Sequence, residues 1–436
     1  MPEPSLRRHL GLPDLVLFNI SAVVGVRWLA AAAHVGPTSI WLWLLAAVFF
    51  FVPTAMVVSE LAGRMPQQGG IYRWTQNSFG DWHAFLCAWC YWTNNLFYLP
   101  SLALAGVTMA LYVFGSRYQH LETSSSYALT GALLVIWLVT LLNARGLGVG
   151  KWVGNTGGLC MFLGGALLVI AAAYAALQTG SATSWRVLPA LDWERVNFWP
   201  QLAFAFGGLE LSAILGGEIS NVQSTIRRAA WISAAAIATF YIGGTAAILL
   251  LLPPDQVSII NGITQAGFAA GQIMQFGWLS PLLALLITAG IAGQLGSWVA
   301  GCARLPMVLG VDHMAPAAFT RLPVSLVFQA AASSLFLLAM HLGDDLRTGY
   351  QLLVDMAVIT YFIPFLYLFL TAWKHGLRWP AAAGLVVTLL AVSFSFVPPR
   401  GVDSVWLFEA KLVGGTVLLI LAAKLWFSHR LRATRA

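Results

Sequence analysis

The chain has 436 residues, of which 59% are hydrophobic and only 9% are charged. Soluble domains carry about 25% charged residues, so this composition excludes a soluble protein, and it also excludes disordered and collagen-like chains. The formal net charge is +7, but the basic residues are spread thinly and form no dense patch, which excludes a nucleic-acid-binding surface. We therefore predict an all-α membrane protein that crosses the bilayer many times.

Apolar runs separated by glycine, proline and charged residues predict twelve transmembrane helices. In chain order we place them at 12–36, 39–62, 80–114, 127–143, 151–177, 196–216, 227–252, 279–305, 324–342, 350–373, 379–397 and 405–427. Residues 253–278 are less apolar and begin with two prolines, so we predict an external loop with a short surface helix. Residues 1–11 and 428–436 are short polar tails.

The basic residues of the connecting segments predict the orientation. If the N-terminus is cytoplasmic, sixteen lysines and arginines fall on the cytoplasmic side and six on the other, with Arg27 left inside a span. Because cytoplasmic segments of membrane proteins are enriched in lysine and arginine, both termini are predicted to be cytoplasmic. The expected location is the cell membrane.

Two of the predicted spans read poorly as continuous helices. The first contains Gly25 two residues before Arg27, and the sixth contains Gly207-Gly208 shortly before Glu210. Glycine weakens a helix, and a charge at membrane depth is costly unless it has a partner or a function. Weak segments at matching places in two halves indicate an inverted-repeat transporter, with repeats at 12–177 and 196–373 and two further helices at 379–427. The alternative is that these glycines only permit close helix packing.

The residues that could support enzymatic chemistry are scattered. Cys87 and Cys90 have a C-x-x-C spacing, but they lie in an apolar run, as do Cys160 and Cys302, so packing roles are expected. No H-E-x-x-H motif is present and the eight histidines are dispersed. We therefore expect no enzyme, no metal site and no cofactor.

Four stretches resemble the amino acid–polyamine–organocation transporter superfamily. They are Asn19-Ile20 through Gly25-Val26-Arg27; Glu60 followed by Met65-Pro66-Gln67-Gln68-Gly69-Gly70-Ile71-Tyr72-Arg73-Trp74; Phe206-Gly207-Gly208-Leu209-Glu210 with Gly217-Glu218-Ile219-Ser220-Asn221; and Leu295-Gly296-Ser297-Trp298 through Asp312-His313-Met314-Ala315-Pro316. The second stretch is the most specific match. The sequence departs from the family at Arg27, where a glycine is usual, and at Val222 and Arg227, where prolines are usual.

The resemblance implies a leucine-transporter-type fold whose broken first and sixth helices bind the backbone of an amino acid. The free N–H groups at a helix start attract a carboxylate, and the free C=O groups at a helix end attract an ammonium. We therefore expect the substrate carboxylate at the amides of Val24, Gly25, Val26 and Arg27, and its ammonium at the carbonyls of Phe204, Ala205 and Phe206. Gly208 would give the substrate access to the backbone.

The resemblance also suggests side chains for the site. Phe204 matches an aromatic gate, Trp298 matches an aromatic wall of the cavity, and Asn95 matches a site-facing amide in the third span. Ordinary packing, or a hydrogen bond between helices, is the alternative for each of them.

Arg27 and Glu210 are both predicted near the middle of the membrane. They either form an internal ion pair, or Arg27 binds an anionic substrate group while Glu210 carries a proton. Asp355 is a further acidic candidate for cation coupling. Glu60, Glu218 and Arg304 lie near span ends, where we interpret them as an intracellular gate, with simple solvation as the alternative.

The expected function is secondary transport of amino acids, rather than polyamines, by exchange or by proton coupling. A sodium site would use carbonyls of the broken first helix and hydroxyls of the eighth span, where Ser297 is available. The resemblance also implies that a proton-coupled transporter can carry a lysine in the fifth span in place of the sodium ion, but this span has only Lys151, at its start. A sodium-coupled symporter and a transport-inactive receptor or partner subunit of the same fold stay open. The expected partners are a small-molecule substrate and the lipid bilayer, without nucleic acid.

Overall fold

The computed structural model describes residues 10–115, 117–185, 198–199, 202–259, 261–341, 346–396 and 405–435. The described residues form helices joined by short turns and contain no β-strand, although Leu10 and Ile219 form a parallel β-bridge. An all-helical fold is the expected outcome for such an apolar chain, because a helix pairs its own backbone polar groups in the absence of water.

The helices follow one another closely along the chain. They are α1 (Leu12–Val23), α2 (Arg27–Val35), α3 (Ser39–Ala46), the π-helix η1 (Ala47–Phe51), α4 (Val52–Arg64), α5 (Ile71–Phe79), α6 (Asp81–Ala110), the 3-10 helices η2 (Leu111–Phe114) and η3 (Gln119–Thr123), α7 (Ser125–Ala144), α8 (Leu147–Thr179), α10 (Leu211–Ile214), the 3-10 helix η4 (Gly216–Glu218), α11 (Val222–Leu251), the 3-10 helix η5 (Pro254–Gln256), α12 (Gly262–Ile273), α13 (Leu279–Cys302), α14 (Arg304–Val311), the 3-10 helix η6 (Ala317–Thr320), α15 (Leu322–His341), α16 (Leu346–Lys374), α17 (Arg378–Ser395) and α18 (Val405–Arg435).

The described helices include enough long apolar segments for a protein that crosses the membrane several times. Seven of them are long and apolar enough to span a bilayer, and an eighth is added if α1 and α2 are one broken span. Two shorter apolar helices, Ile359–Lys374 and Arg378–Phe394, overlap the predicted spans 350–373 and 379–397. The multi-pass helical fold is thus confirmed, whereas the total of twelve spans stays a prediction.

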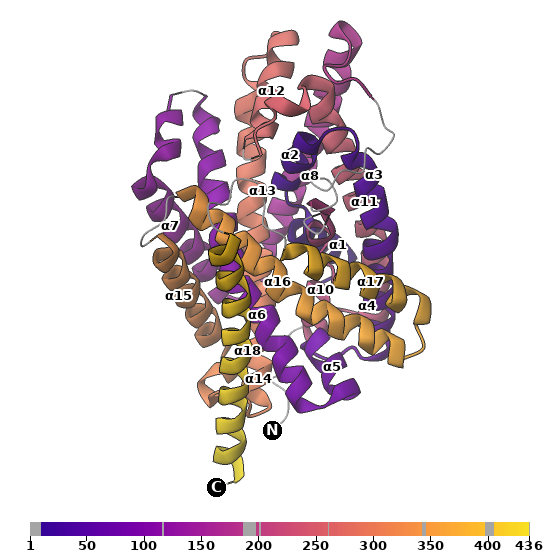
Figure 1. Ribbon diagram of the computed structural model, residues 1–436, viewed down its shortest axis with the longest axis vertical. Helices are drawn as coiled ribbons and strands as arrows, with labels where there is room; N and C mark the ends of the chain where they lie inside the picture. Colours follow the sequence, from indigo (N-terminus) through magenta and orange to yellow (C-terminus); the bar gives the residue numbers. More distant parts are fainter. Residues whose placement is uncertain are drawn as a thin grey trace.

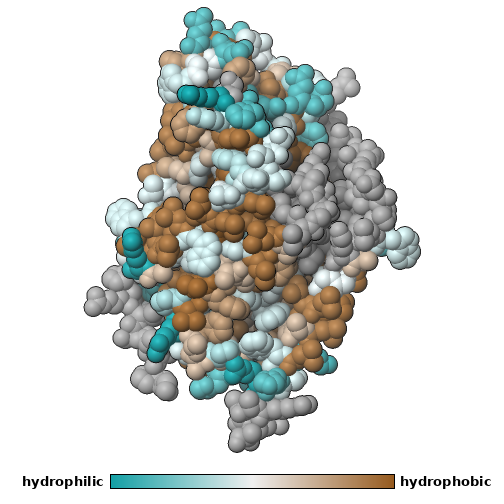
Figure 2. Space-filling view, turned by 90° about the vertical axis from the view of Figure 1, so that its left-hand side faces the viewer, coloured by the Kyte–Doolittle hydropathy of each residue, from teal (hydrophilic) through white to brown (hydrophobic). Residues whose placement is uncertain are grey.

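The helices are arranged so that the molecule has two distinct ends. Figure 1 shows α12 at one end of the long axis, and α5, α14 and the last turns of α18 at the other. Between the ends, hydrophobic side chains form a broad band over the surface that faces the viewer in Figure 2, with hydrophilic residues above and below it. Such a band is what lipid tails would cover.

Small residues bring the long helices α8 and α13 into close contact. A Cβ added to Gly157 in α8 would lie 2.3 Å from the Cα of Gly293 in α13. Two backbones can approach this closely only where neither residue has a side chain, as is common between helices in membranes. The crossing fixes α13 against α8 and so holds the side chains of α13 that reach the centre of the molecule.

The segment predicted as an external loop is more closely packed than expected. It contains η5 and α12, and the buried face of α12 includes Ile263, Ala266 and Ala270. A Cβ at Gly262 would lie 2.9 Å from Ala30 in α2. One face of α12 therefore lies against α2, while Phe268 on another face is 60% exposed, so the predicted short surface helix is present.

The Gly157–Gly293 crossing can be tested by a single added methyl group. We expect Gly157→Ala to destabilise the protein by about 1–3 kcal/mol, the usual cost of overpacking, and to lower its melting temperature in detergent. Gly148→Ala in the same helix is the matched control, since a Cβ there meets nothing within 4 Å. Equal melting temperatures for the two variants would show that the crossing is not tight.

Candidate functional site

The first helix break separates α1 from α2 at Val24–Val26, and the two helices are bent by 49°. The backbone of Val24 is extended, and the chain enters α2 with a hydrogen bond of 3.0 Å from the Trp28 amide to the Gly25 carbonyl. A Cβ at Gly25 would lie 2.7 Å from the Trp28 ring, so glycine is needed there. Among the described residues, no acceptor pairs with the Val26 amide at the positive end of α2.

The second helix break is the turn Phe206–Glu210, between the helical residues 202–205 and α10. Gly208 has a φ of +119°, a conformation that glycine adopts without strain. A Cβ at Gly208 would lie 3.2 Å from the carbonyl oxygen of Ala22, near the end of α1. Both helices are therefore interrupted at the glycines where the sequence predicts it, and the two breaks touch.

The side chain of Tyr241 in α11 lies between the two breaks. Its hydroxyl accepts a hydrogen bond from the Gly25 amide (2.9 Å) and lies 2.7 Å from the Val23 carbonyl oxygen and 2.9 Å from that of Ala205. We expected the Gly25 amide and the Ala205 carbonyl to be unpaired and open to a substrate. That expectation was wrong for this structure, because a tyrosine hydroxyl already pairs with both groups.

Glu210 is completely buried at the end of the second break. Its carboxylate accepts hydrogen bonds from the hydroxyls of Tyr91 (2.6 Å) and Tyr361 (2.5 Å) and from the Gly208 amide (3.2 Å). Three donors around one carboxylate compensate for its removal from water. The hydroxyls come from α6 and α16, so Glu210 connects three parts of the chain.

Arg27, the first residue of α2, has different neighbours. Its guanidinium lies over the Trp28 ring, 4.4 Å from the centroid, and 5.4 Å from the centroid of Tyr98. It also donates a hydrogen bond of 3.4 Å to the Ser101 hydroxyl. Among the described residues, no ion pair joins Arg27 to Glu210, so the first of the two arrangements considered for this pair is not formed in this structure.

Aromatic side chains enclose the space beside the breaks. Phe204 makes edge contacts with Trp28 (5.8 Å), Tyr98 (5.8 Å) and Tyr361 (5.1 Å). Trp298 packs 5.1 Å from Tyr98, and its ring N–H donates to the Ala22 carbonyl (2.9 Å). Phe204 and Trp298 are therefore brought together around Tyr98, next to both breaks.

The side-chain amides of Asn94 and Asn95 in α6 are fully buried, and no hydrogen-bond partner for either is found among the described residues. Tyr91, Asn94, Tyr98 and Ser101 follow a spacing of three and four residues, which puts them on one helical face. Asn95 is likewise four residues from Tyr91 and three from Tyr98. Spacing and burial therefore make Asn94 as good a candidate as Asn95, which the family resemblance had favoured.

Several central residues were not found from the sequence. Gln294 donates to the Ala22 carbonyl (3.1 Å) and lies 3.4 Å from the Tyr98 hydroxyl. Tyr91, Tyr241 and Tyr361 were also missed, since tyrosines in apolar runs read as packing or interfacial residues. Gln294 could have been recognised, because an amide inside a predicted span needs a partner.

A buried ion pair lies towards the α5 and α14 end of the molecule. The guanidinium of Arg304 makes two hydrogen bonds to the Glu218 carboxylate, one of them 3.0 Å long, and another to the Ala300 carbonyl. Both side chains are almost inaccessible, at 3% and 5% exposure. Glu60 lies apart from this pair and forms an exposed bridge of 2.8 Å with Arg64, so the three predicted gate residues do not form one cluster.

A second contact at the same end joins α5 to the end of α14. Arg73 makes two hydrogen bonds to Asp312, of 2.7 and 3.1 Å, and the Tyr72 hydroxyl donates to the same carboxylate (2.5 Å). Burial, and the adjacent Asp312 carboxylate, raise the pKa of Tyr72 well above its usual value. Tyr72 therefore keeps its proton and acts as a hydrogen-bond donor to Asp312.

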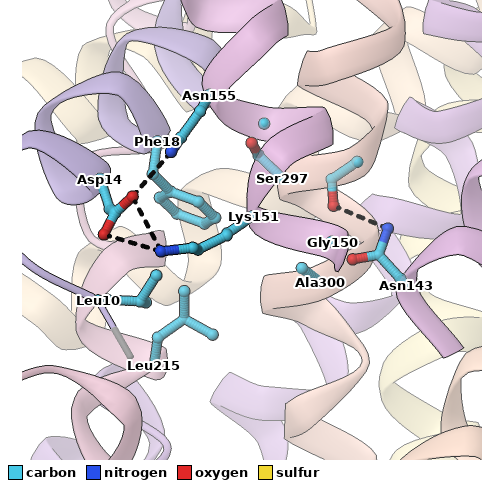
Figure 3. A pocket seen from close by; sticks show the side chains of 12 residues that line it. Leu10, Asp14, Phe18, Asn143, Gly150, Lys151, Asn155, Leu215, Ser297 and Ala300 are labelled. Carbon is cyan, nitrogen blue, oxygen red and sulfur yellow. Dashed lines mark hydrogen bonds and ion pairs between the residues drawn. The ribbon is translucent and has the colours of Figure 1, made fainter. Parts of the chain in front are cut away.

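A small cavity of about 20 Å³ lies between α1, α8 and α13 (Figure 3). On one side the Asp14 carboxylate binds the Lys151 ammonium (3.4 Å) and the Asn155 amide (2.8 Å). On the other side is the Ser297 hydroxyl, which is buried and has no hydrogen-bond partner among the described residues. A cavity of this size holds about one water molecule, and Lys151 already supplies a positive charge at its edge.

His34 is exposed at the end of α2, and a nitrogen of its ring lies 3.0 Å from the Val257 carbonyl oxygen. Asp355 belongs to α16, but its side chain lies outside the part of the chain that the structure describes.

Comparisons with known proteins identify relatives over nearly the whole chain. The family model described as amino acid permease matches residues 10–417. An uncharacterised transporter of Legionella pneumophila is 26% identical over 95% of both chains, and the inner membrane transporter YjeM of Salmonella typhimurium is 23% identical over 95% of both. A probable agmatine/putrescine antiporter of Lactococcus lactis, AguD, is 24% identical over 68% of this chain and 63% of its own.

The fold also has a counterpart among solved structures. The crystal structure of MhsT in complex with L-phenylalanine matches with a TM-score of 0.65, covering 97% of this chain and 99% of that chain at 14% identity. At this identity the likeness establishes the overall fold.

Removing one partner of the buried Arg304–Glu218 pair should destabilise the protein strongly. We expect Arg304→Gln to destabilise the protein by about 3–5 kcal/mol, because it leaves a buried carboxylate without its partner. Glu60→Gln, which removes the exposed bridge to Arg64, should change the melting temperature little. The measurement is the melting temperature in detergent. Similar changes in melting temperature for the two variants would contradict the conclusion that Arg304 and Glu218 form a buried ion pair.

Proposed function

Since this chain belongs to the amino acid permease family of membrane transporters, we propose that it moves amino acids across the cell membrane by alternating access. The observation that carries the proposal is the contact between the two helix breaks, where Gly208 lies against the Ala22 carbonyl. Interrupted helices that meet inside the membrane offer polar backbone groups to a solute of both charges. A zwitterionic amino acid is such a solute.

The substrate carboxylate would bind at the start of α2. The Val26 amide lies at the start of α2, with that of Arg27 next to it, where the helix dipole favours a negative charge. The Val24 amide, which we also expected to bind the carboxylate, instead donates to the Ile20 carbonyl (2.9 Å) and belongs to the end of α1, so that expectation was wrong for this structure. Gly25 keeps the first break accessible, but its amide is shared with Tyr241.

The substrate ammonium would bind at the end of the helical residues 202–205. Each carbonyl oxygen has two lone pairs, so those of Phe204 and Ala205 can accept a second donor besides the Gly207 amide and the Tyr241 hydroxyl. The Phe206 carbonyl follows in the second break, beside Gly208.

The substrate side chain would extend among Phe204, Trp298 and the buried amides of α6, Asn94 and Asn95. Phe204 contacts both Trp28 and Tyr98, and a change in its rotamer would cover or uncover the breaks. Arg27 adds a positive charge to this space, which disfavours a cationic side chain. We therefore propose amino acids as substrates in preference to polyamines.

The architecture that goes with this function has twelve spans with both termini in the cytoplasm. Residues 12–177 and 196–373 would be the two inverted repeats, each of five helices, and 379–427 would add the last two spans. The location of α5, α14 and the end of α18 opposite α12 supports this orientation (Figure 1). Opening on the cytoplasmic side would then require the buried Arg304–Glu218 pair to separate.

For the coupling we propose exchange, or a proton carried by Glu210. Its carboxylate lies between two tyrosine hydroxyls beside the second break, where a change of protonation would alter the hydrogen bonds that connect α6, α10 and α16. Asp355 in α16 is a further candidate. Sodium coupling is the alternative, but the Lys151 ammonium already lies at the edge of the cavity next to Ser297 and binds the Asp14 carboxylate there.

Counterflow of radiolabelled amino acids into proteoliposomes tests the function. We expect liposomes preloaded with an unlabelled amino acid to accumulate the labelled one, without any requirement for sodium. Accumulation should not occur with empty liposomes unless a pH gradient is imposed. Absence of both counterflow and gradient-driven uptake for all common amino acids would favour the transport-inactive receptor instead.

The role of Glu210 is tested in the same liposomes. If it carries the proton, Glu210→Gln should keep counterflow but lose uptake driven by a pH gradient, because the glutamine retains hydrogen-bonding capacity but cannot release a proton. Loss of both activities in a folded variant would assign Glu210 a purely structural role.

Arg27 is predicted to set the substrate preference. In competition with counterflow of a neutral amino acid, we expect Arg27→Gly to increase the apparent affinity for agmatine about tenfold, since removing one partly buried positive charge relieves repulsion of about 1.4 kcal/mol. Arg27→Lys, which keeps the charge, should resemble the wild type. Arg117→Gly in an exposed segment is the control for loss of an arginine, and an unchanged preference in Arg27→Gly would refute the role.

A further inference from the structure

Tyr241 is the side chain that makes hydrogen bonds to both helix breaks. It lies in the middle of α11 and is fully buried. Its hydroxyl has the Gly25 amide at 2.9 Å, the Val23 carbonyl at 2.7 Å and the Ala205 carbonyl at 2.9 Å. One oxygen atom of α11 therefore connects the end of α1, the first break and the helix that precedes the second break.

The ring that carries this hydroxyl is rigidly held. It stacks on Trp43 with centroids 4.4 Å apart and an interplanar angle of 8°, and Phe206 packs edge-on against it at 5.3 Å. The Trp43 ring N–H donates to the Thr245 hydroxyl, one turn further along α11 (3.0 Å). With one face stacked on Trp43 and Phe206 packed against both rings of the stack, the hydroxyl has little freedom beyond rotation of its own proton.

A phenol has a single proton, so Tyr241 cannot donate to both carbonyls at once. It accepts from the Gly25 amide, and its proton goes either to Val23 in the first helix or to Ala205 in the second. The carbonyl that does not receive the proton keeps an unused acceptor in the interior of the protein. Burial makes such an unused acceptor costly, and it is therefore a good place for an additional donor.

We propose that Tyr241 is a positioning residue of the substrate site, whose proton passes from the Ala205 carbonyl to the Val23 carbonyl when a substrate ammonium binds at Ala205. This inference rests on the proposed amino acid transport. The ammonium donates to the Ala205 carbonyl, and the Tyr241 hydroxyl then donates its proton to the Val23 carbonyl at the end of α1. Binding of the ammonium at the second break thereby stabilises the conformation of the first break, where the carboxylate binds. Tyr241 does this without contacting the substrate itself.

The test is Tyr241→Phe in proteoliposomes, with concentration-dependent counterflow of an amino acid that the wild type carries. We expect KM to rise about tenfold while the maximal rate changes less than threefold. The variant loses the hydroxyl that positions the binding site but no group that takes part in the transport step itself. In detergent, the variant should need about tenfold more of the same amino acid than the wild type to reach the same thermal stabilisation.

The matched control is Tyr127→Phe in α7. It also removes a tyrosine hydroxyl that donates to a backbone carbonyl, that of Val107 at 3.0 Å, but away from the breaks. It should leave KM unchanged. A second variant, Thr245→Val, removes the partner of Trp43 and loosens the ring stacked on Tyr241 while retaining the hydroxyl, so it should raise KM by a smaller factor. It replaces Tyr241→Phe if that variant does not fold.

The outcomes separate this inference from the function on which it rests. A wild type that transports no amino acid overturns the proposed function. A wild type that transports, together with Tyr241→Phe of unchanged KM and unchanged thermal stabilisation by substrate, overturns the role of Tyr241 alone. A lower melting temperature and lower maximal rate at constant KM would also overturn it, because that pattern is expected of a residue that only stabilises the fold.

Discussion

The absence of water in the bilayer interior is the constraint on which this structure depends. A helix that is interrupted there exposes amides and carbonyls that lipid cannot pair. At the first break, the Ala22 carbonyl accepts from Gln294 and Trp298 of α13, and the groups around Gly25 bind Tyr241 of α11. The protein thus supplies, from neighbouring helices, the partners that an unbroken helix would have within itself.

The same constraint explains how acidic groups are accommodated in the interior. Glu210 has two tyrosine hydroxyls and a backbone amide, and Glu218 has the guanidinium of Arg304. The first arrangement surrounds a carboxylate with neutral donors, so the group can change its protonation without leaving an unpaired countercharge. The second joins opposite charges, and neither partner can change without a large cost. Chemistry therefore favours Glu210 for a proton and Glu218 for a mechanical contact.

The sequence was sufficient to predict the membrane class, the course of the long helices and the position of both breaks. These properties depend on local composition: apolar runs, and glycines next to a charge. The neighbours of the breaks could not be predicted, since they depend on which faces of distant helices meet. Tyr241 lies 216 positions from Gly25, and nothing in its apolar surroundings distinguishes it from a tyrosine that packs against lipid.

The same limit applies to Arg27 and Glu210. Their types and depths followed from the sequence, and a pairing between opposite charges was a natural hypothesis. In the structure the Glu210 carboxylate instead accepts hydrogen bonds from Tyr91 and Tyr361, because the turn at Gly208 directs it towards α6 and α16. A rotation of the chain at one glycine decided the partners, and such a rotation leaves no trace in residue spacing.

The short pairing of Leu10 with Ile219 has a mechanical consequence. Two backbone hydrogen bonds, of 3.1 and 3.0 Å, fasten the segment before α1 to the segment after α10. The contact of Gly208 with Ala22 fastens the same two parts at a second height. Two segments that are in contact at two places cannot rotate about one of them alone. Therefore α1 and α10 either tilt together, or the hydrogen bonds of Leu10 must break first.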